Sequence, residues 1–396
     1  MNLTIPLPRI LDEDREAEIV KQGVYASPHV RSLRISKDRT ALEVEGDEAG
    51  DPAELEQKLT RFVAQMVEKY RPLPKKERRR LERRDRGAYE RGVYEELERR
   101  GFVLPLGRGQ VGLGGPALAL AEAVDHACAR LGRQGFGATS VTYPALIPAD
   151  VLARCGYFSS FPQSVSFVSH LTEDHDLIEE FRKANTGKGL VIPRPEALPT
   201  PEACLSPAVC YHCYQSLEGA KLGEECRSFT TVGKCFRYES KNITGLDRLW
   251  DFTMREVIFV GTEASVARRR EQGIDLVASM IAEWDLDCVI ESANDPFFAT
   301  VHTNKAYWQS RGDLKFEMRL GVEPGEDGER RSVAAGSFNL HEDFFGRTFS
   351  ITASDGKPAF TGCLAWGLER WVLAAFTQHG FDPSRWPGSL RADVWG

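Results

Sequence analysis

Several features are missing from this sequence. It has no apolar run long enough to span a bilayer, no N-terminal secretion signal, no internal repeat and no long low-complexity segment. These absences argue against a membrane-spanning, secreted or repeat protein. The nine cysteines are odd in number and scattered over 396 residues, which argues against a disulfide framework. They fit free thiols in a reducing cytoplasm, with a metal site as a second use.

Charge and length set further bounds. A net charge of −7 argues against a general nucleic-acid coat, although it leaves room for a local basic patch. The length suits two or three domains, and we expect a small α/β module with a charged helix over 1–100 and a larger catalytic unit over 101–396. In the first unit, alternating residues predict a hairpin over 30–45 and helical spacing predicts a helix from Pro52.

The charged run over 75–86 is predicted to be a solvated helix with ion pairs at four-residue spacing. The alternative is an electropositive face for an acidic partner, either RNA or a carrier protein. Further along, residues 262–285 are predicted to form a helix with one apolar face. Arg268, Arg269 and Arg270 belong to its polar face.

The segment 231–261 has the strongest chemical signal. Two β-rich runs flank a polar loop with Asn242 and Gly245, which predicts two antiparallel strands. By the two-residue period, Phe252, Met254 and Glu256 share one face of the second strand. Arginines on the hairpin suit a nucleoside triphosphate, because guanidinium groups bind phosphates bidentately. A surface ion pair between Arg237 and Glu239 is the simpler alternative.

This hairpin resembles motif 2 of the class II aminoacyl-tRNA synthetases, with the pattern Phe-Arg-Tyr-Glu over 236–239, a loop arginine, and an aromatic residue before a glutamate. Residues 114–144 resemble motif 1, and 361–376, with Gly-Leu-Glu-Arg over 367–370, resemble motif 3. The resemblance implies an α+β fold, with an antiparallel sheet of the class II synthetase type flanked by helices. It also implies a homodimer formed through motif 1.

The family resemblance assigns roles in binding ATP. Arg237 would hold the α-phosphate, Glu239 the adenine amino group and Arg248 the γ-phosphate. Phe252 would stack on adenine, and Arg370 would enclose the phosphates from the other side, so that Arg237 and Arg370 are the catalytic pair. Mg2+ is expected with ATP, but Val333 stands where seryl enzymes have a metal-binding acid, which leaves the Mg2+ ligands unassigned.

Within class II, the chain is most similar to the methanogen-type seryl-tRNA synthetases and to amino acid–carrier-protein ligases. That branch implies Zn2+ held by Cys210, Glu256 and Cys363, with the substrate's α-amino group in the open position. One alternative is a zinc knuckle at Cys210, His212 and Cys213, which the lack of a second Cys/His pair disfavours. The other is that the three residues are unrelated core thiols and a surface acid.

The resemblance implies an ATP-dependent ligase that makes an aminoacyl-adenylate of a small amino acid and transfers it to the phosphopantetheine thiol of a carrier protein. In carrier-protein ligases a helix after motif 2 contacts the carrier, which implies that role for the helix over 262–285, where Arg268, Arg269 and Arg270 would meet an acidic carrier. Trp366 is expected to line a pocket for a small side chain. A zinc-dependent seryl-type tRNA synthetase is the alternative, and a silent, partner-binding paralogue is a third. No anticodon-type domain follows motif 3, whereas an extension of about a hundred residues precedes the core and keeps tRNA open.

Overall fold

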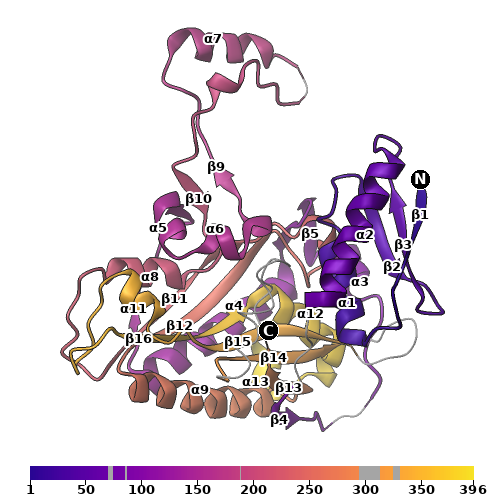
Figure 1. Cartoon of the computed structure of the whole chain (residues 1–396). Coiled ribbons are helices and arrows are strands. Elements are labelled where there is room, and N and C mark those ends of the chain that lie inside the picture. The colour runs from indigo at the N-terminus through magenta and orange to yellow at the C-terminus, as the bar shows by residue number, and fades with distance from the viewer. Residues whose placement is uncertain (70–74, 85–86, 188, 294–312, 324–330) are drawn as a thin grey trace.

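The computed structural model describes residues 1–69, 75–84, 87–187, 189–293, 313–323 and 331–396. A small N-terminal module, coloured indigo in Figure 1, lies beside a larger body. Its three-stranded antiparallel sheet has the order β1-β3-β2, and apolar side chains of its strands and two helices form a separate core. The elements are β1 (Asn2–Pro6), α1 (Glu13–Gly23), β2 (Val30–Ile35), β3 (Ala41–Gly46) and α2 (Pro52–Lys69). The predicted hairpin and helix are confirmed, whereas β1 and α1 were not predicted.

The predicted charged helix over 75–86 is wrong. Residues Glu77–Leu81 form strand β4, which pairs with β13 (Cys288–Ser292) at the edge of the large sheet. Arg78 and Arg79 of β4 form ion pairs of 2.5 and 2.8 Å with Glu271 and Asp275. The run is therefore neutralised by acids distant in sequence. The boundary at residue 100 stays a prediction, against which the pairing of β4 with the larger body argues.

An eight-stranded sheet organises the larger body. Its order is β4-β13-β14-β15-β16-β12-β11-β7, and every pair is antiparallel except β11 with β7. Helices flank the sheet, so the predicted α+β class is confirmed. The strands not yet defined are β7 (Thr139–Ser140), β11 (Cys226–Phe236), β12 (Asp251–Gly261), β14 (Lys315–Val322), β15 (Arg331–Leu340) and β16 (Phe360–Gly367).

One face of this sheet is covered by helices. Side chains at alternate positions, such as Val257 and Phe259 of β12 and Leu364 of β16, pack with these helices in the main core. Gly273 of α9 lies so close to Leu364 that a Cβ atom there would sit 2.6 Å from its side chain. The helices of this layer are α4 (Gly115–Arg130), α9 (Glu263–Glu283), α12 (Leu368–His379) and α13 (Gly388–Trp395).

Smaller elements complete the body. Helix α7 (His175–Ala184) stands away from the rest of the molecule beyond strands β9 and β10 (Figure 1). Among the described residues, no helix has both the length and the apolar character needed to cross a membrane. The remaining helices and strands are α3 (Val93–Arg99), β5 (Val103–Gly107), β6 (Gln110–Leu113), β8 (Leu146–Pro148), α5 (Ala149–Arg154), α6 (Tyr157–Ser160), β9 (Phe167–Val168), β10 (Ala203–Leu205), α8 (Cys210–Ser216) and α11 (Phe344–Thr348).

A buried ion pair joins the helical layer to the sheet. Arg255 of β12 donates two hydrogen bonds, of 2.7 and 2.8 Å, to the Asp125 carboxylate of α4. We expect Asp125→Ala to lower the free energy of unfolding by about 3 kcal/mol, because Arg255 would stay buried without its counter-ion. Urea denaturation measures this loss. The exposed pair of Arg79 and Asp275 is the control, and a comparable loss in Asp275→Ala would contradict the prediction.

Candidate functional site

The face of the sheet opposite the helical layer carries the predicted site, and β12 is its centre. Glu256 lies opposite Thr231 of β11 and opposite Ala365 of β16. Side chains of directly paired residues project to the same face. Phe252 and Met254 pack with apolar neighbours on this side of the sheet, as their two-residue spacing from Glu256 predicts. The hairpin of β11 and β12 therefore forms as predicted and presents Glu256 between two neighbouring strands.

Three predicted metal ligands come together. One ligand atom each of Cys210, Glu256 and Cys363 lies within 4.8 Å of the others, and all three residues are buried. They come from the start of α8, from β12 and from β16. Oxygen Oε2 of Glu256 is buried and makes no hydrogen bond with the described residues. A buried carboxylate oxygen without a donor is costly, and a cation would satisfy it.

The acidities in this cluster follow from burial and proximity. Burial first, and then the neighbouring Cys363, raise the pKa of Glu256 well above its usual range, while Arg237 acts in the opposite direction. A hydrogen bond between the two thiols lowers the pKa of Cys363 and raises that of Cys210. Two sulfurs and a carboxylate are a donor set that Zn2+ accepts, and three protein ligands leave a fourth position open. The residues thus fit a catalytic type of zinc site.

Polar groups behind Cys363 support the cluster. The Asn339 side chain donates a 3.3 Å hydrogen bond to the Cys363 sulfur. His341 contacts the Tyr214 hydroxyl at 3.3 Å and also lowers the pKa of Cys363. Such neighbours orient metal ligands and adjust their basicity. The sequence analysis did not assign them a role, because their place beside Cys363 depends on the pairing of β15 with β16.

The alternative zinc knuckle is not formed. Residues 210–216 are helical, and the metal-ligand cluster contains Cys210 but neither His212 nor Cys213. The His212 ring stacks on Tyr143, with 5.7 Å between ring centroids, and burial lowers its pKa to about 4. His212 and Cys213 are packed core residues on either side of the helix that presents Cys210.

Arg237 lies between the predicted nucleotide site and the metal cluster. Its Nε donates a 3.0 Å hydrogen bond to the carbonyl of Pro207, three residues before Cys210. Its guanidinium carbon lies 5.5 Å from the centre of the Phe252 ring. Because its charge also acts on Glu256, Arg237 is close to both sets of predicted residues.

The remaining predicted nucleotide ligands lie near one another. Arg248 forms a 3.2 Å ion pair with Glu239. Arg370 donates hydrogen bonds of 2.7 Å to the Asp247 carbonyl and 2.8 Å to the Ala334 carbonyl. Burial lowers the pKa of Arg370, while the charges of Glu239 and Asp247 act in the opposite direction. The ion pair that forms is thus between Glu239 and Arg248, and the roles of these residues toward ATP stay predictions.

Two sequence expectations about the surroundings need comment. Trp366 does not lie on the site face, because alternation along β16 turns it into the helical core while Cys363 and Ala365 face the site. Its expected place in the amino acid pocket is therefore wrong. Val333 is a buried apolar residue of β15, so it supplies no ligand for Mg2+.

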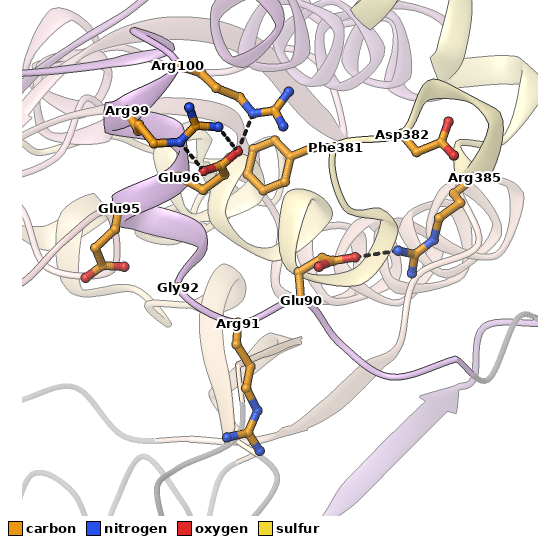
Figure 2. A pocket seen from close by; sticks show the side chains of 10 residues that line it. All are labelled: Glu90, Arg91, Gly92, Glu95, Glu96, Arg99, Arg100, Phe381, Asp382 and Arg385. Carbon is orange, nitrogen blue, oxygen red and sulfur yellow. Dashed lines mark hydrogen bonds and ion pairs between the residues drawn. The ribbon is translucent and has the colours of Figure 1, made fainter.

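A separate polar cavity lies outside the predicted site. Its volume is about 610 Å³, and it is lined by α3 and residues 381–385 (Figure 2). Glu96 accepts hydrogen bonds of 2.6 Å from both Arg99 and Arg100, and these arginines lower its pKa to about 2. Glu90 is paired with Arg385. None of the predicted site residues lines this cavity. Five of its charged side chains form ion pairs with one another, Glu96 with Arg99 and Arg100, and Glu90 with Arg385.

The chain is similar to proteins of two kinds. It is 33% identical over 262 residues to amino acid–[acyl-carrier-protein] ligase 1 of Bradyrhizobium diazoefficiens. The aligned region covers 66% of this chain and 77% of that protein. Ligase 2 of the same organism is 32% identical over 285 residues, covering 72% and 83%. The type-2 serine–tRNA ligase of Methanopyrus kandleri is 27% identical over 308 residues, covering 74% and 58%. No protein-family model matches the chain.

Solved structures show the same fold. The seryl-tRNA synthetase of M. kandleri, in a complex with A. aeolicus tRNASec, superposes with a TM-score of 0.67 and 23% identity. The superposition covers 99% of this chain and 77% of that one. A serine–tRNA ligase from Naegleria fowleri in complex with AMP has a TM-score of 0.60, 13% identity and coverage of 86% and 71%. These likenesses confirm the predicted class II synthetase fold.

Metal content tests the three-residue cluster. We expect the purified protein to contain a zinc ion per chain, and Cys363→Ser to lose it, because a hydroxyl is a poor replacement for a thiolate ligand. Elemental analysis after gel filtration measures the metal. Cys213→Ser is the matched control, since Cys213 lies one helical turn from Cys210 but outside the cluster. Zinc retained by Cys363→Ser, or lost only in Cys213→Ser, would refute the assignment.

Proposed function

The chain belongs to the family of amino acid–[acyl-carrier-protein] ligases, and on that premise we propose that it activates a small amino acid with ATP and transfers it to the phosphopantetheine thiol of a carrier protein. One observation carries the proposal. The Cys210–Glu256–Cys363 cluster lies beside the hairpin that carries Arg237. A group that binds an amine and a group that binds phosphate thus share one side of one sheet.

The first step joins the amino acid to AMP. A carboxylate oxygen of the amino acid attacks the α-phosphorus of ATP, the bond to the β-phosphate oxygen breaks, and pyrophosphate leaves. Negative charge develops on the phosphoryl oxygens, so positioning and fixed positive charge contribute most of the catalysis. Arg237 would act on the α-phosphate, with Arg370 on the other side and Arg248 toward the γ-phosphate. Glu239 and Phe252 would hold adenine by its amino group and its ring face.

The second step moves the aminoacyl group to sulfur. The thiolate of the carrier's arm attacks the carbonyl carbon of the adenylate, and AMP leaves with the electron pair of the anhydride bond. In both steps Zn2+, held by Cys210, Glu256 and Cys363, would supply a position for the substrate's α-amino group. Mg2+ is proposed to enter with the phosphates of ATP, since Val333 offers no carboxylate.

A small amino acid fits the neighbourhood of the cluster. Ala365 lies opposite Glu256, and Val209, Cys235 and Met254 close the adjacent surface. Their side chains leave no charged partner for a large polar substrate. We therefore propose glycine, alanine or serine as the class of substrate. Size discrimination among them is worth only about 1–3 kcal/mol per methylene, so some overlap is expected.

The carrier is proposed to meet the start of α9. Arg268 is exposed and pairs with Glu225, while Arg269 lies over the Phe136 ring. Both line a cleft of about 360 Å³, and they would attract an acidic carrier. Arg270 was expected on this surface, and that expectation is wrong. Its side chain is buried and donates a hydrogen bond to the carbonyl of Asp313.

A tRNA acceptor is the second candidate, and the superposition on the M. kandleri synthetase favours it because it covers nearly the whole chain. The N-terminal module, however, has ten Lys and Arg against fourteen Asp and Glu over residues 1–69, a net charge of −4. An RNA-binding domain normally carries positive charge for the phosphate backbone. A homodimer through α4 and β7 is proposed as the family resemblance implies.

The acceptor can be identified directly. We expect labelled glycine, alanine or serine to be transferred in an ATP-dependent reaction to a phosphopantetheinylated acyl carrier protein, and not to bulk tRNA. Acid precipitation measures the label, and hydroxylamine release distinguishes a thioester. The apo carrier, which lacks the arm, is the control. Label found on tRNA alone would overturn the proposal that a carrier protein is the acceptor and would support tRNA as the acceptor instead.

The arginines can be tested on the first step alone. We expect Arg237→Ala to reduce ATP–pyrophosphate exchange by about a hundredfold or more, because a charge that stabilises the transition state is lost. Arg370→Ala should have a similar effect. Arg347→Ala is the control, since Arg347 forms an exposed ion pair with Asp343. Wild-type protein without exchange would instead favour a silent, partner-binding protein.

A further inference from the structure

The N-terminal module touches residues 239–248, the loop of the hairpin that carries Arg237 and Arg248. We propose that this module is a positioning element for the ATP-binding loop, with Lys241 and Asn242 as the loop residues that it holds. The proposal rests on the proposed function only in taking the hairpin as the ATP site.

Hydrogen bonds connect the two parts. The Lys241 ammonium donates to the carbonyl of Pro28 at 2.9 Å and also to the carbonyl of Val30. The Asn242 side chain donates to the carbonyl of Lys21 at 3.0 Å. All three acceptors belong to the segment 21–30, which joins the end of α1 to β2. A charged donor makes stronger hydrogen bonds than a neutral one, so Lys241 is the main link.

The accepting segment is itself rigid. Backbone hydrogen bonds from Tyr25 to Gln22 and from Val30 to Ser27 close successive turns at 3.0 and 3.2 Å. His29 contacts Asp47 at 2.9 Å, which ties the segment to the end of β3. The module therefore offers carbonyl groups in fixed positions, and the loop binds to a prepared surface.

Tyr25 brings the module close to a predicted ATP ligand. Burial, followed by the charge of Glu239, raises the pKa of Tyr25 to about 12. Glu239 is the partner of Arg248 in the free protein. From there the contacts continue, because Arg370 donates to the carbonyl of Asp247. The segment 21–30 thus lies next to the loop that carries Glu239 and Arg248 and that Arg370 also contacts.

The loop needs external support. Ser240 has a φ of 49°, a left-handed conformation that is unfavourable for a residue other than glycine. On the side of the body, Arg108 donates a 2.6 Å hydrogen bond to the Ser240 carbonyl. The loop is therefore held between Arg108 and the module. Without the module, we expect the strained turn to relax and Glu239 to leave its place.

The charge of the module agrees with an internal role. Its net charge of −4 suits neither tRNA nor an acidic carrier. Its positively charged partner is instead Lys241 of the loop. The groups that bind the ammonium of Lys241 are the carbonyl oxygens of Pro28 and Val30.

Lys241→Met and Tyr25→Ala test the proposal, with Arg34→Ala as control because Arg34 is an exposed residue of the same module. ATP–pyrophosphate exchange is measured with ATP and whichever of glycine, alanine and serine gives the highest rate. We expect the KM for ATP to rise about five- to tenfold in Lys241→Met, because both charged hydrogen bonds of Lys241 to the module are lost, and the KM for the amino acid to change less than about twofold. Arg34→Ala should match the wild type.

Amide hydrogen exchange of the free protein gives a readout that needs no activity. We expect exchange within 239–248 to accelerate about fivefold or more in Lys241→Met and in Tyr25→Ala, and not in Arg34→Ala. If Lys241→Met does not fold, Asn242→Ala replaces it. Unchanged loop exchange in the folded variants would overturn the proposal. A lack of ATP–pyrophosphate exchange in the wild-type protein would overturn the proposed function. Amide hydrogen exchange of the loop would still decide whether the module positions it.

Discussion

The register of β12 is the constraint on which the site depends. The strand pairs along its length with β11 and with β16, so each side chain faces either the layer of α4, α9 and α12 or the opposite face, which carries the site. Arg255 faces Asp125 of α4, and Glu256 faces the two thiols. A shift by one residue would exchange these positions. It would put a carboxylate against Asp125 and a guanidinium between Cys210 and Cys363, so the ion pair and the metal cluster require the same register.

Local pattern was sufficient to predict this part of the fold. Alternation along 251–261, the polar turn and the strand that leads into Gly367 each depend on residues close in sequence. The family resemblance then joined Cys210, Glu256 and Cys363, which no local pattern connects. Their grouping is visible only because β16 lies beside β12 and α8 packs against side chains of both strands. The residues behind Cys363 were missed for the same reason, since Asn339 reaches the sulfur from β15, the neighbouring strand on which it lies opposite Cys363.

The errors also have a common physical cause. The run over 77–81 is as rich in charged residues as a solvated helix. Its Arg78 and Arg79, however, form ion pairs with Glu271 and Asp275 of α9, nearly two hundred residues away in the sequence. Arg270 looks like a surface charge, yet it binds a carbonyl in the interior. Trp366 is near Cys363 in sequence and on the opposite face in space. In each case a distant partner or the strand pleat decides where the side chain points.

Electrostatics links the module, the loop and the metal cluster. Three acidic groups of the cluster are buried together, and this arrangement is favourable only with positive charge nearby. The guanidinium group of Arg237 supplies part of that positive charge. In the proposed reaction it would bind the α-phosphate of ATP. In the proposed reaction the loop that follows Arg237 would meet two demands, because Glu239 and Arg248 would turn to the nucleotide while the loop keeps its shape. Contacts from the N-terminal module to the side chain of Lys241 would meet both demands. Carbonyl groups of the module hold the side chains of Lys241 and Asn242, and the side chains of Glu239 and Arg248 are not among the groups they hold.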